Sequence, residues 1–593
     1  MRIENKTEAL KLDFFQSLFQ CAENAYAAER ERFERAMKQY KGSSEIDGSD
    51  ESAITVRNIT YEIIESQVSS SIPQPKADAT SYSARRGRNA QSIERLCRSL
   101  REHLPFDELN DIDERYTYIY GGSVWYVDWD NSTECMGEVG GVKVMCLSPN
   151  DFVPQPGISS IDDMEYCFLK FTTTRGDLVR KYGVSDDDTR LAEFEFEYDV
   201  SNSVSDTVRI ITCFYRDEDG EIGRYIFSGD LVLSDLPRYY MRKEIDTDAC
   251  DNTDRPKSAR KKSVGIRDVS HEIIDGRLIF EAIPEASWPA PSESCRFTSN
   301  NDAGEIRIPY YVPKLFPIAI RKNTSSEKSL LGQSDCDYIR PEQQAINKVE
   351  SRILKKLLRA AVTPIVPEDA TVSINNSVFG QVIKMKPGET AAQYGKVDTT
   401  PDISQDIAEA ERLYDHAKRV IGISDAYQGI DTGSANESGY AKQLRISQAT
   451  GRLESKRKMK HTVYARIDKL IFMLYLAFAD EPRRLSFKDA FGRIHETQFN
   501  RYDFIEYDRK RCEYYYDDAY EFSVDLNGGN EYQREALWQR NLENLKAGTL
   551  GDPTNPATLL RYWQCQERAH YPYARENVEY FTDAASEEVL VYE

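Results

Sequence analysis

The side chains best suited to acid–base or metal chemistry in this sequence are clustered carboxylates. Asp186, Asp187 and Asp188 are consecutive, and a second acidic group spans 217–221. Carboxylates bind divalent cations when other segments of the chain add further oxygen ligands. The same composition is typical of solvated turns, which is the simpler interpretation of both groups.

Histidine and cysteine provide no stronger site. His495 precedes Glu496, but no second histidine follows at the spacing that a zinc-binding helix requires. Cys250 and Cys295 could form half of a zinc site, yet no neighbouring cysteine or histidine completes it. The motifs GxxxxGK[ST], GxGxxG and GxSxG, which bind phosphate or position a nucleophile, are absent. We therefore expect no catalytic residues, no metal and no cofactor.

Charge and composition restrict the class of protein. The 593 residues include 77 basic and 99 acidic side chains, a net charge of −22, which argues against tight non-specific DNA binding. A channel through which DNA slides is a different case, because strong phosphate contacts would hold the DNA still. The eleven cysteines stand singly, without a CxxC pair, which indicates reduced thiols in a cytosol. The first residues lack an apolar signal core, and the longest apolar stretch, 470–479, is too short to span a membrane.

The first 330 residues predict helices followed by strands. Apolar positions recur at helical spacing in three segments, 7–40, 54–72 and 91–116. From 117 to about 235 the pattern alternates with period two, apart from a short helix at 177–182. Weak periodicity over 246–301 indicates a variable insertion. The insertion contains a basic cluster, Arg255, Lys257, Arg260, Lys261, Lys262 and Arg267. These residues could contact nucleic acid, or they could lie in a solvated loop.

The second half begins with a long helix, expected from 332 to 361 with Pro341 in its first turn. The apolar face of this helix includes Leu357. The opposite face is basic, with Lys348, Arg352, Lys355, Lys356 and Arg359. Positive charge near a helix C-terminus complements the helix dipole. The same face would also suit a surface that meets DNA or bridges subunits, and the residues leave both interpretations open.

Strands and turns separate this helix from the next. Strands are expected at 372–374 and 381–385. A second helix begins at Thr400-Pro401-Asp402, has Ile407 on its apolar face, and ends at Gly422. A loop over 424–439 follows it. The remaining elements predicted are a long helix over 440–478, strands at 485–487 and 522–526, and helices at 531–546 and 556–567.

This order of elements resembles the portal proteins of tailed bacteriophages, the head–tail connector family. The residues that carry the resemblance are Ile308-Pro309-Tyr310-Tyr311-Val312-Pro313, Gly332-Gln333-Ser334-Asp335, Gln343-Gln344-Ala345-Ile346-Asn347, Ser351 and Thr363-Pro364. It implies a multi-domain α+β fold assembled as a ring. The implied domains are a mixed α/β wing (1–330, with the insertion 246–301), a stem helix (331–361), a small β clip (362–401), a second stem helix (402–422), a tunnel loop (423–438), a long wing helix with returning strands (439–527) and an α-helical crown (528–593). The insertion departs from the family pattern.

The resemblance also implies a site and a function. The tunnel loop would face DNA with a tip that has no lysine or arginine, although an ordinary surface loop has the same composition. The residues expected there are Asp425, Gly429, Asp431, Gly433, Ser434, Asn436 and Glu437. The family forms rings of twelve that conduct double-stranded DNA without sequence specificity during packaging and ejection.

Portal proteins are not enzymes, because the terminase motor hydrolyses the ATP. The partners implied are further copies of the chain, the terminase large subunit, major capsid and scaffolding proteins, and head-completion or adaptor proteins, with no membrane. The ring would assemble in the host cytoplasm and remain in the virion, at the portal vertex of the capsid. Two alternatives are a phage tail or baseplate assembly protein and, disfavoured by the missing motifs, a phage nuclease or hydrolase.

Overall fold

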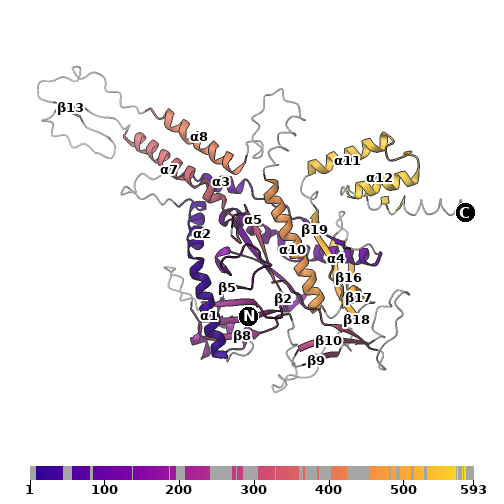
Figure 1. The fold of residues 1–593 in the computed structure, drawn as a ribbon. Coiled ribbons are helices and arrows are strands. Elements are labelled where there is room, and N and C mark those ends of the chain that lie inside the picture. Colours follow the sequence, from indigo (N-terminus) through magenta and orange to yellow (C-terminus); the bar gives the residue numbers. More distant parts are fainter. Residues whose placement is uncertain are drawn as a thin grey trace.

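Helices and strands both occur throughout the chain, which is an α+β protein as predicted (Figure 1). The computed structural model describes residues 8–43, 56–80, 84–135, 138–185, 187–194, 207–240, 270–274, 277–284, 305–327, 329–359, 365–367, 383–385, 402–423, 453–479, 482–488, 494–508, 513–525 and 531–568, with a few further positions up to 581.

The N-terminal third begins with helices that differ from the predicted ones chiefly at their ends. They are α1 (Glu8–Ala25), α2 (Ala27–Tyr40), α3 (Ile59–Glu65), α4 (Ala84–His103) and α5 (Phe106–Tyr120). The helix expected over 7–40 is interrupted at Tyr26. The helix expected over 91–116 is two helices, because Pro105 begins a new one as the N-cap of α5. Asn58 starts α3 later than expected, since its side chain accepts a hydrogen bond from the Tyr61 backbone N–H at 3.0 Å.

A five-stranded antiparallel sheet confirms the alternating pattern. Its order is β4 (Phe152–Pro154), β5 (Tyr166–Thr174), β6 (Thr207–Arg216), β7 (Ile222–Ser228) and β8 (Leu231–Leu236). Helix α1 covers one face, where Phe15 stacks on Tyr225 with ring centroids 4.4 Å apart. The short helix predicted between strands is α6 (Arg175–Tyr182).

The main core lies around a three-stranded sheet in the order β12 (Ile318–Lys322), β2 (Gly122–Cys135) and β3 (Glu138–Leu147). Helices α5 and α10 (Glu454–Phe478) pack against this sheet. Gly121 joins α5 to β2 with a φ of +91°, in the left-handed region that favours glycine. A Cβ atom there would stand 2.3 Å from the Gly332 carbonyl oxygen, so the close approach of two backbones also requires glycine.

The predicted insertion contains part of a sheet. Strands β9 (Ser270–Ile274) and β10 (Arg277–Pro284) pair with each other, and β10 also pairs with β11 (Glu305–Pro309). Weak periodicity therefore did not mean an absence of strands. The basic cluster between Arg255 and Arg267 and both candidate zinc cysteines lie outside the described residues.

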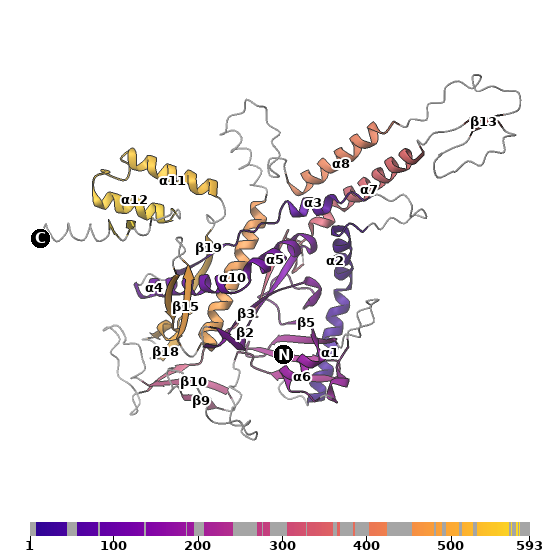
Figure 2. The same ribbon diagram turned by 180° about the vertical axis from the view of Figure 1, so that it is seen from behind.

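Two antiparallel helices project from the body as a hairpin, α7 (Asp335–Arg359) and α8 (Ser404–Ile421) (Figures 1 and 2). Between them in the chain, β13 (Ile365–Pro367) pairs in parallel with β14 (Ile383–Met385). Two expectations need correction. Pro341 lies inside α7 rather than in its first turn, and α8 begins at Ser404 rather than at Pro401. Of the strand expected over 381–385, the described residues are 383–385, and all three are in β14. The strand expected at 372–374 lies outside the described residues.

After α10 the chain returns to strands, of which the sequence predicted only the first and last. They are β15 (Arg483–Lys488), β16 (Ile494–Phe499), β17 (Ile505–Asp508), β18 (Glu513–Tyr516) and β19 (Tyr520–Asp525). Strand β19 pairs with β1 (Gln74–Ala79), which follows α3 and was not predicted. The C-terminal helices α11 (Glu531–Lys546) and α12 (Pro556–Arg568) match the prediction and pack against each other (Figure 2).

Candidate functional site

The basic face of α7 is partly used inside the hairpin. Arg352 Nη2 lies 2.7 Å from Asp406 Oδ1 on α8, and Lys356 donates to the other oxygen of the same carboxylate. The hydrogen bond from Lys356 and the attraction of Arg352 lower the pKa of Asp406 below its ordinary value of 3.8. Two of the five expected cations therefore join the helices. Lys348 and Lys355 are exposed, and the side chain of Arg359 lies outside the described residues.

The root of the hairpin is held by an apolar cluster and by the residues that carried the resemblance. The cluster joins α3, α7 and α8 and comprises Ile59, Ile63, Ile339, Ile346, Tyr414, Ala417 and Ile423. Gln343 accepts a hydrogen bond from the Thr60 backbone N–H at 3.0 Å. It donates to the Arg57 carbonyl oxygen at 2.7 Å and to Asn347 Oδ1 at 2.9 Å. Gln343 therefore fixes the hairpin to the segment that begins α3.

The far end of the hairpin leaves apolar side chains exposed. Leu357 is 49 % and Ile407 is 47 % exposed, although the helical spacing placed both on the apolar faces of their helices. Both lie near the end of the hairpin, Leu357 close to the last residue of α7 and Ile407 in the first turn of α8. The seven tunnel-loop residues, Asp425 to Glu437, lie outside the described residues, which end at Ile423 on this side of the loop.

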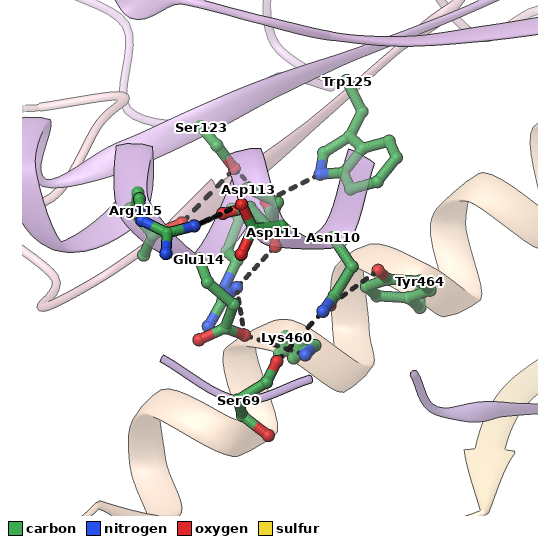
Figure 3. A network of polar contacts seen from close by, with 12 residues as sticks. Ser69, Asn110, Asp111, Asp113, Glu114, Arg115, Ser123, Trp125, Lys460 and Tyr464 are labelled. Carbon is green, nitrogen blue, oxygen red and sulfur yellow. Dashed lines mark hydrogen bonds and ion pairs between the residues drawn. The ribbon is translucent and has the colours of Figure 1, made fainter. Parts of the chain in front are cut away.

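A group of buried charged residues lies in the body, where the sequence analysis named no site. Asp113, Glu114, Arg321 and Lys460 are buried together between α5, β12 and α10 (Figure 3). Arg321 Nη1 lies 2.9 Å from Glu114 Oε1 and also donates to Asp113. Lys460 Nζ lies 2.8 Å from the same Glu114 oxygen. Two acids face two bases, so the cluster is neutral.

Helix α10 carries further polar groups on this side. We call Lys456, Lys460, Tyr464 and Asp468 the polar stripe of α10, because residues four apart lie on one helix face. Each member meets a partner from another segment. Lys460 Nζ lies 2.8 Å from Glu114 Oε1, and Tyr464 Oη lies 3.1 Å from Asn110 Oδ1 (Figure 3). Lys456 Nζ lies 2.7 Å from Asp335 Oδ2, and Asp468 Oδ2 lies 2.6 Å from Arg101 Nη2.

Asp335 links the stripe to the root of the hairpin. This first residue of α7 accepts from Gln67 at 3.0 Å and from Asn323 at 2.7 Å, in addition to pairing with Lys456. Ser334, immediately before it, accepts from the Cys336 backbone N–H at 3.0 Å and so caps the helix, which was predicted to begin at residue 332. The Ser334-Asp335 pair that contributed to the resemblance therefore joins the hairpin to α10.

Burial and pairing act in opposite directions on the carboxylates of this region. Burial alone would raise the pKa of Glu114, but the attraction of Arg321 and Lys460 outweighs it and lowers the pKa below 4.5. For Asp468 burial is the larger effect, and it raises the pKa above 3.8 despite Arg101. The spacing of these residues does not distinguish them from the other charged residues of α10, such as Lys458 and Arg466, so the sequence alone carried no signal for the stripe.

The other candidates from the sequence remain surface features. Asp187 is almost fully exposed, and Asp188 accepts from the Ser185 hydroxyl at 2.7 Å in a local turn; Asp186 lies outside the described residues. Residues 217–221 form a turn closed by the Gly220 N–H on the Asp217 carbonyl at 3.0 Å. His495 stacks on Phe487 across β15 and β16.

Over the described ranges, no group of three or more histidine, cysteine or acidic side chains is arranged to hold a metal ion. The helices in those ranges include none that is long and apolar enough to cross a membrane. No family model matches the chain, and no curated protein sequence matches it.

Proposed function

We propose that the chain is the portal protein of a tailed bacteriophage, one subunit of a ring through which DNA enters and leaves the capsid. The observation that carries this proposal is the α7–α8 hairpin. Two antiparallel helices leave the body side by side, and a small parallel β pair lies between them in the sequence (Figure 1). Helix, small β unit, helix and then a long buried helix is the order expected for stem, clip, stem and wing.

Ring formation would account for the surface at the end of the hairpin. Head-to-tail contacts between identical subunits form a closed ring when the same rotation, repeated from each subunit to the next, returns to the first subunit. Leu357 and Ile407, exposed in a single chain, would then be covered by the hairpins of adjacent copies. The exposed cations Lys348 and Lys355 are available for acidic groups on a neighbour or on DNA.

The mechanism under this proposal is passive. The terminase motor would dock at the clip and hydrolyse ATP, while the ring provides a tunnel and later a seat for head-completion proteins. With a net charge of −22 the chain as a whole is not attracted to phosphate, so DNA could slide without being held by sequence-independent attraction.

Light scattering of the purified full chain tests the proposal. Twelve copies of the 68.1 kDa chain would have a mass of about 817 kDa, and negative-stain images would show rings with a central opening. Replacing Leu357 and Ile407 by aspartate should return the protein to a folded monomer, judged by circular dichroism. Leu191→Asp is the control, because Leu191 is similarly exposed and lies in a short 3-10 helix between β5 and β6, far from the hairpin in the sequence. A wild-type chain that stays monomeric at high concentration would overturn the proposal.

A further inference from the structure

The α7–α8 hairpin has two broad faces that are marked by different ion pairs. On the first face, Arg57 Nη1, from the segment before α3, lies 2.9 Å from Glu411 Oε1 on α8 and 3.9 Å from Glu350 Oε1 on α7. We call this the Arg57 face. On the second, which we call the His416 face, His416 Nδ1 of α8 lies 2.9 Å from Glu342 Oε1 of α7. Five residues separate Glu411 from His416, which places the two side chains about 140° apart around α8.

Each helix has one exposed apolar side chain at the outer end of the Arg57 face. Leu357 follows Glu350 by seven residues, which is two helical turns, and therefore lies on the same side of α7. Ile407 precedes Glu411 by four residues and lies on the same side of α8. Both side chains are nearly half exposed in the single chain.

A second pair of exposed hydrophobic side chains lies at the root of the His416 face. Tyr338 precedes Glu342 by four residues on α7, and Val420 follows His416 by four residues on α8. Tyr338 is 41 % and Val420 is 44 % exposed. The two pairs thus lie on opposite faces and at opposite ends of the hairpin, with one member of each pair on each helix.

The charges of both helices also change along the hairpin. The outer half of α7, residues 347–359, has five basic and one acidic side chain, whereas its inner half, 335–346, has three acidic and one basic. In α8 the order is reversed. Its outer half, 404–412, has three acidic and one basic side chain, and its inner half, 413–421, has two basic and one acidic besides His416. Two hairpins stacked level would place like charges opposite each other, whereas a shift along their length brings opposite charges together.

We propose that hairpins of adjacent copies pack with a shift along their length, the outer end of the Arg57 face of one copy on the root of the His416 face of the next. Leu357 then covers the neighbour's Tyr338, and Ile407 covers the neighbour's Val420. The shift is about 28 Å along α7 and about 20 Å along α8, at 1.5 Å per residue. A second copy is the partner that fits, because the chain itself carries both complementary surfaces. The contact is heterologous and rests on the proposed ring.

Disulfide cross-linking of the full chain tests the contact. Ile407→Cys and Val420→Cys are introduced together, and the assembled protein is oxidised with copper phenanthroline. The two positions are about 20 Å apart on one helix, whereas a disulfide requires Cα atoms within about 7 Å, so the bond can form only between copies. A non-reducing gel should show a ladder of covalent multimers. Leu357→Cys with Tyr338→Cys should give an equivalent ladder through α7.

Two controls separate this contact from other sources of cross-linking. The wild type and each single-cysteine variant measure the background from the native cysteines, and they should give no ladder, because the contact brings each residue to a different residue of its neighbour. Ile407→Cys with Glu409→Cys represents hairpins stacked level. Glu409 lies two residues from Ile407, about 200° around α8, and should not form a cross-link with it.

Light scattering before oxidation distinguishes failure of this contact from failure of the proposed function. Rings that give no ladder with either shifted pair, or a ladder with Ile407→Cys/Glu409→Cys, would overturn the shifted contact and leave the ring in place. A wild-type chain that is monomeric before oxidation would overturn both the contact and the ring.

Discussion

Lys460 Nζ lies 2.8 Å from Glu114 Oε1, and the two side chains are only 6 % and 1 % exposed. With Asp113 and Arg321 they form a buried cluster in which two negative and two positive charges balance. Removing one partner of a buried pair leaves an uncompensated charge away from water, which is far more costly than removing both. The cluster therefore makes the contact of α10 with α5 and β12 sensitive to single substitutions.

Lys460→Met should destabilise the body by about 3–5 kcal/mol, because the cluster is left with an excess negative charge. Thermal and urea unfolding followed by circular dichroism measure the change. The matched control is Lys458→Met, which removes an exposed lysine paired with Glu454 at 3.0 Å on the same helix. Exposed pairs contribute about 0–1 kcal/mol, so equal effects of the two substitutions would contradict the role of burial.

Acidification should weaken the same cluster in a defined pH range. The pKa of Glu114 is lowered in the folded chain relative to 4.5, so its contribution to stability is complete above about pH 4.5. It is lost as the pH falls through the lower folded value. The difference in unfolding midpoint between wild type and Glu114→Gln should be constant from pH 7 to 5 and shrink below pH 4.5. A difference that grows on acidification would contradict the assignment.

Gly121→Ala should be strongly destabilising, whereas Gly183→Ala should be mild. Both glycines have positive φ and end a helix, α5 and α6 respectively, so each alanine incurs roughly 1–2 kcal/mol of left-handed strain. Only at Gly121 would the new Cβ meet backbone, at 2.3 Å from the Gly332 oxygen; nothing lies within 4 Å at Gly183. Overpacking adds about 1–3 kcal/mol. Unfolding midpoints of the two variants provide the comparison.

Asp406→Asn should loosen the outer half of the hairpin without disturbing α10. The substitution removes the charge that holds both Arg352 and Lys356 to α8. Hydrogen exchange measured by mass spectrometry should become faster in the outer turns of α7 and α8. Asp415→Asn is the control, since Asp415 pairs with Lys418 inside α8 at 3.6 Å. Similar exchange in both variants would show that Asp406 does not hold the helices together.

Substitutions that make the proposed tunnel loop positively charged should slow the passage of DNA if this loop faces the DNA. Asp431→Lys with Asn436→Lys would place rings of cations in the channel, because attraction to phosphate does not depend on sequence. Packaging in vitro should slow or stall more strongly at low salt, while ring assembly stays normal. Asp187→Lys adds a cation at an exposed position between β5 and β6 and should have no effect. Unchanged translocation at every salt concentration would place the loop elsewhere.

Helices with a strong apolar period were predictable from the sequence. The last helices, α11 and α12, end within a residue of their predicted limits, and the core face of α10 was identified from Val463 to Leu474. The apolar period reports burial within one segment. It also placed Leu357 and Ile407 on buried faces, where the structure leaves them exposed because the hairpin extends beyond the body.

Features that depend on distant segments were not predictable. Strand β1 contains Pro75, which argues against a central strand, and it exists because β19 pairs with it along one edge. Lys456, Lys460 and Asp468 have the composition of a solvated helix face. Their burial is favourable because distant segments supply a partner of opposite charge for each of them, namely Asp335, Glu114 and Arg101 respectively. No local pattern identifies those partners.

The pairing of β1 with β19 also means that one strand is synthesised well before its partner. Ala79 pairs with Tyr520, so 441 residues of chain separate the two ends of one contact. At translation rates of about 5–20 residues per second, β1 leaves the ribosome roughly 20–90 seconds before its partner strand. Over that interval its edge is open to other nascent chains. A truncated product that ends before Tyr520 would lack the strand with which β1 pairs, and we expect holdase chaperones to bind this region while it is being made.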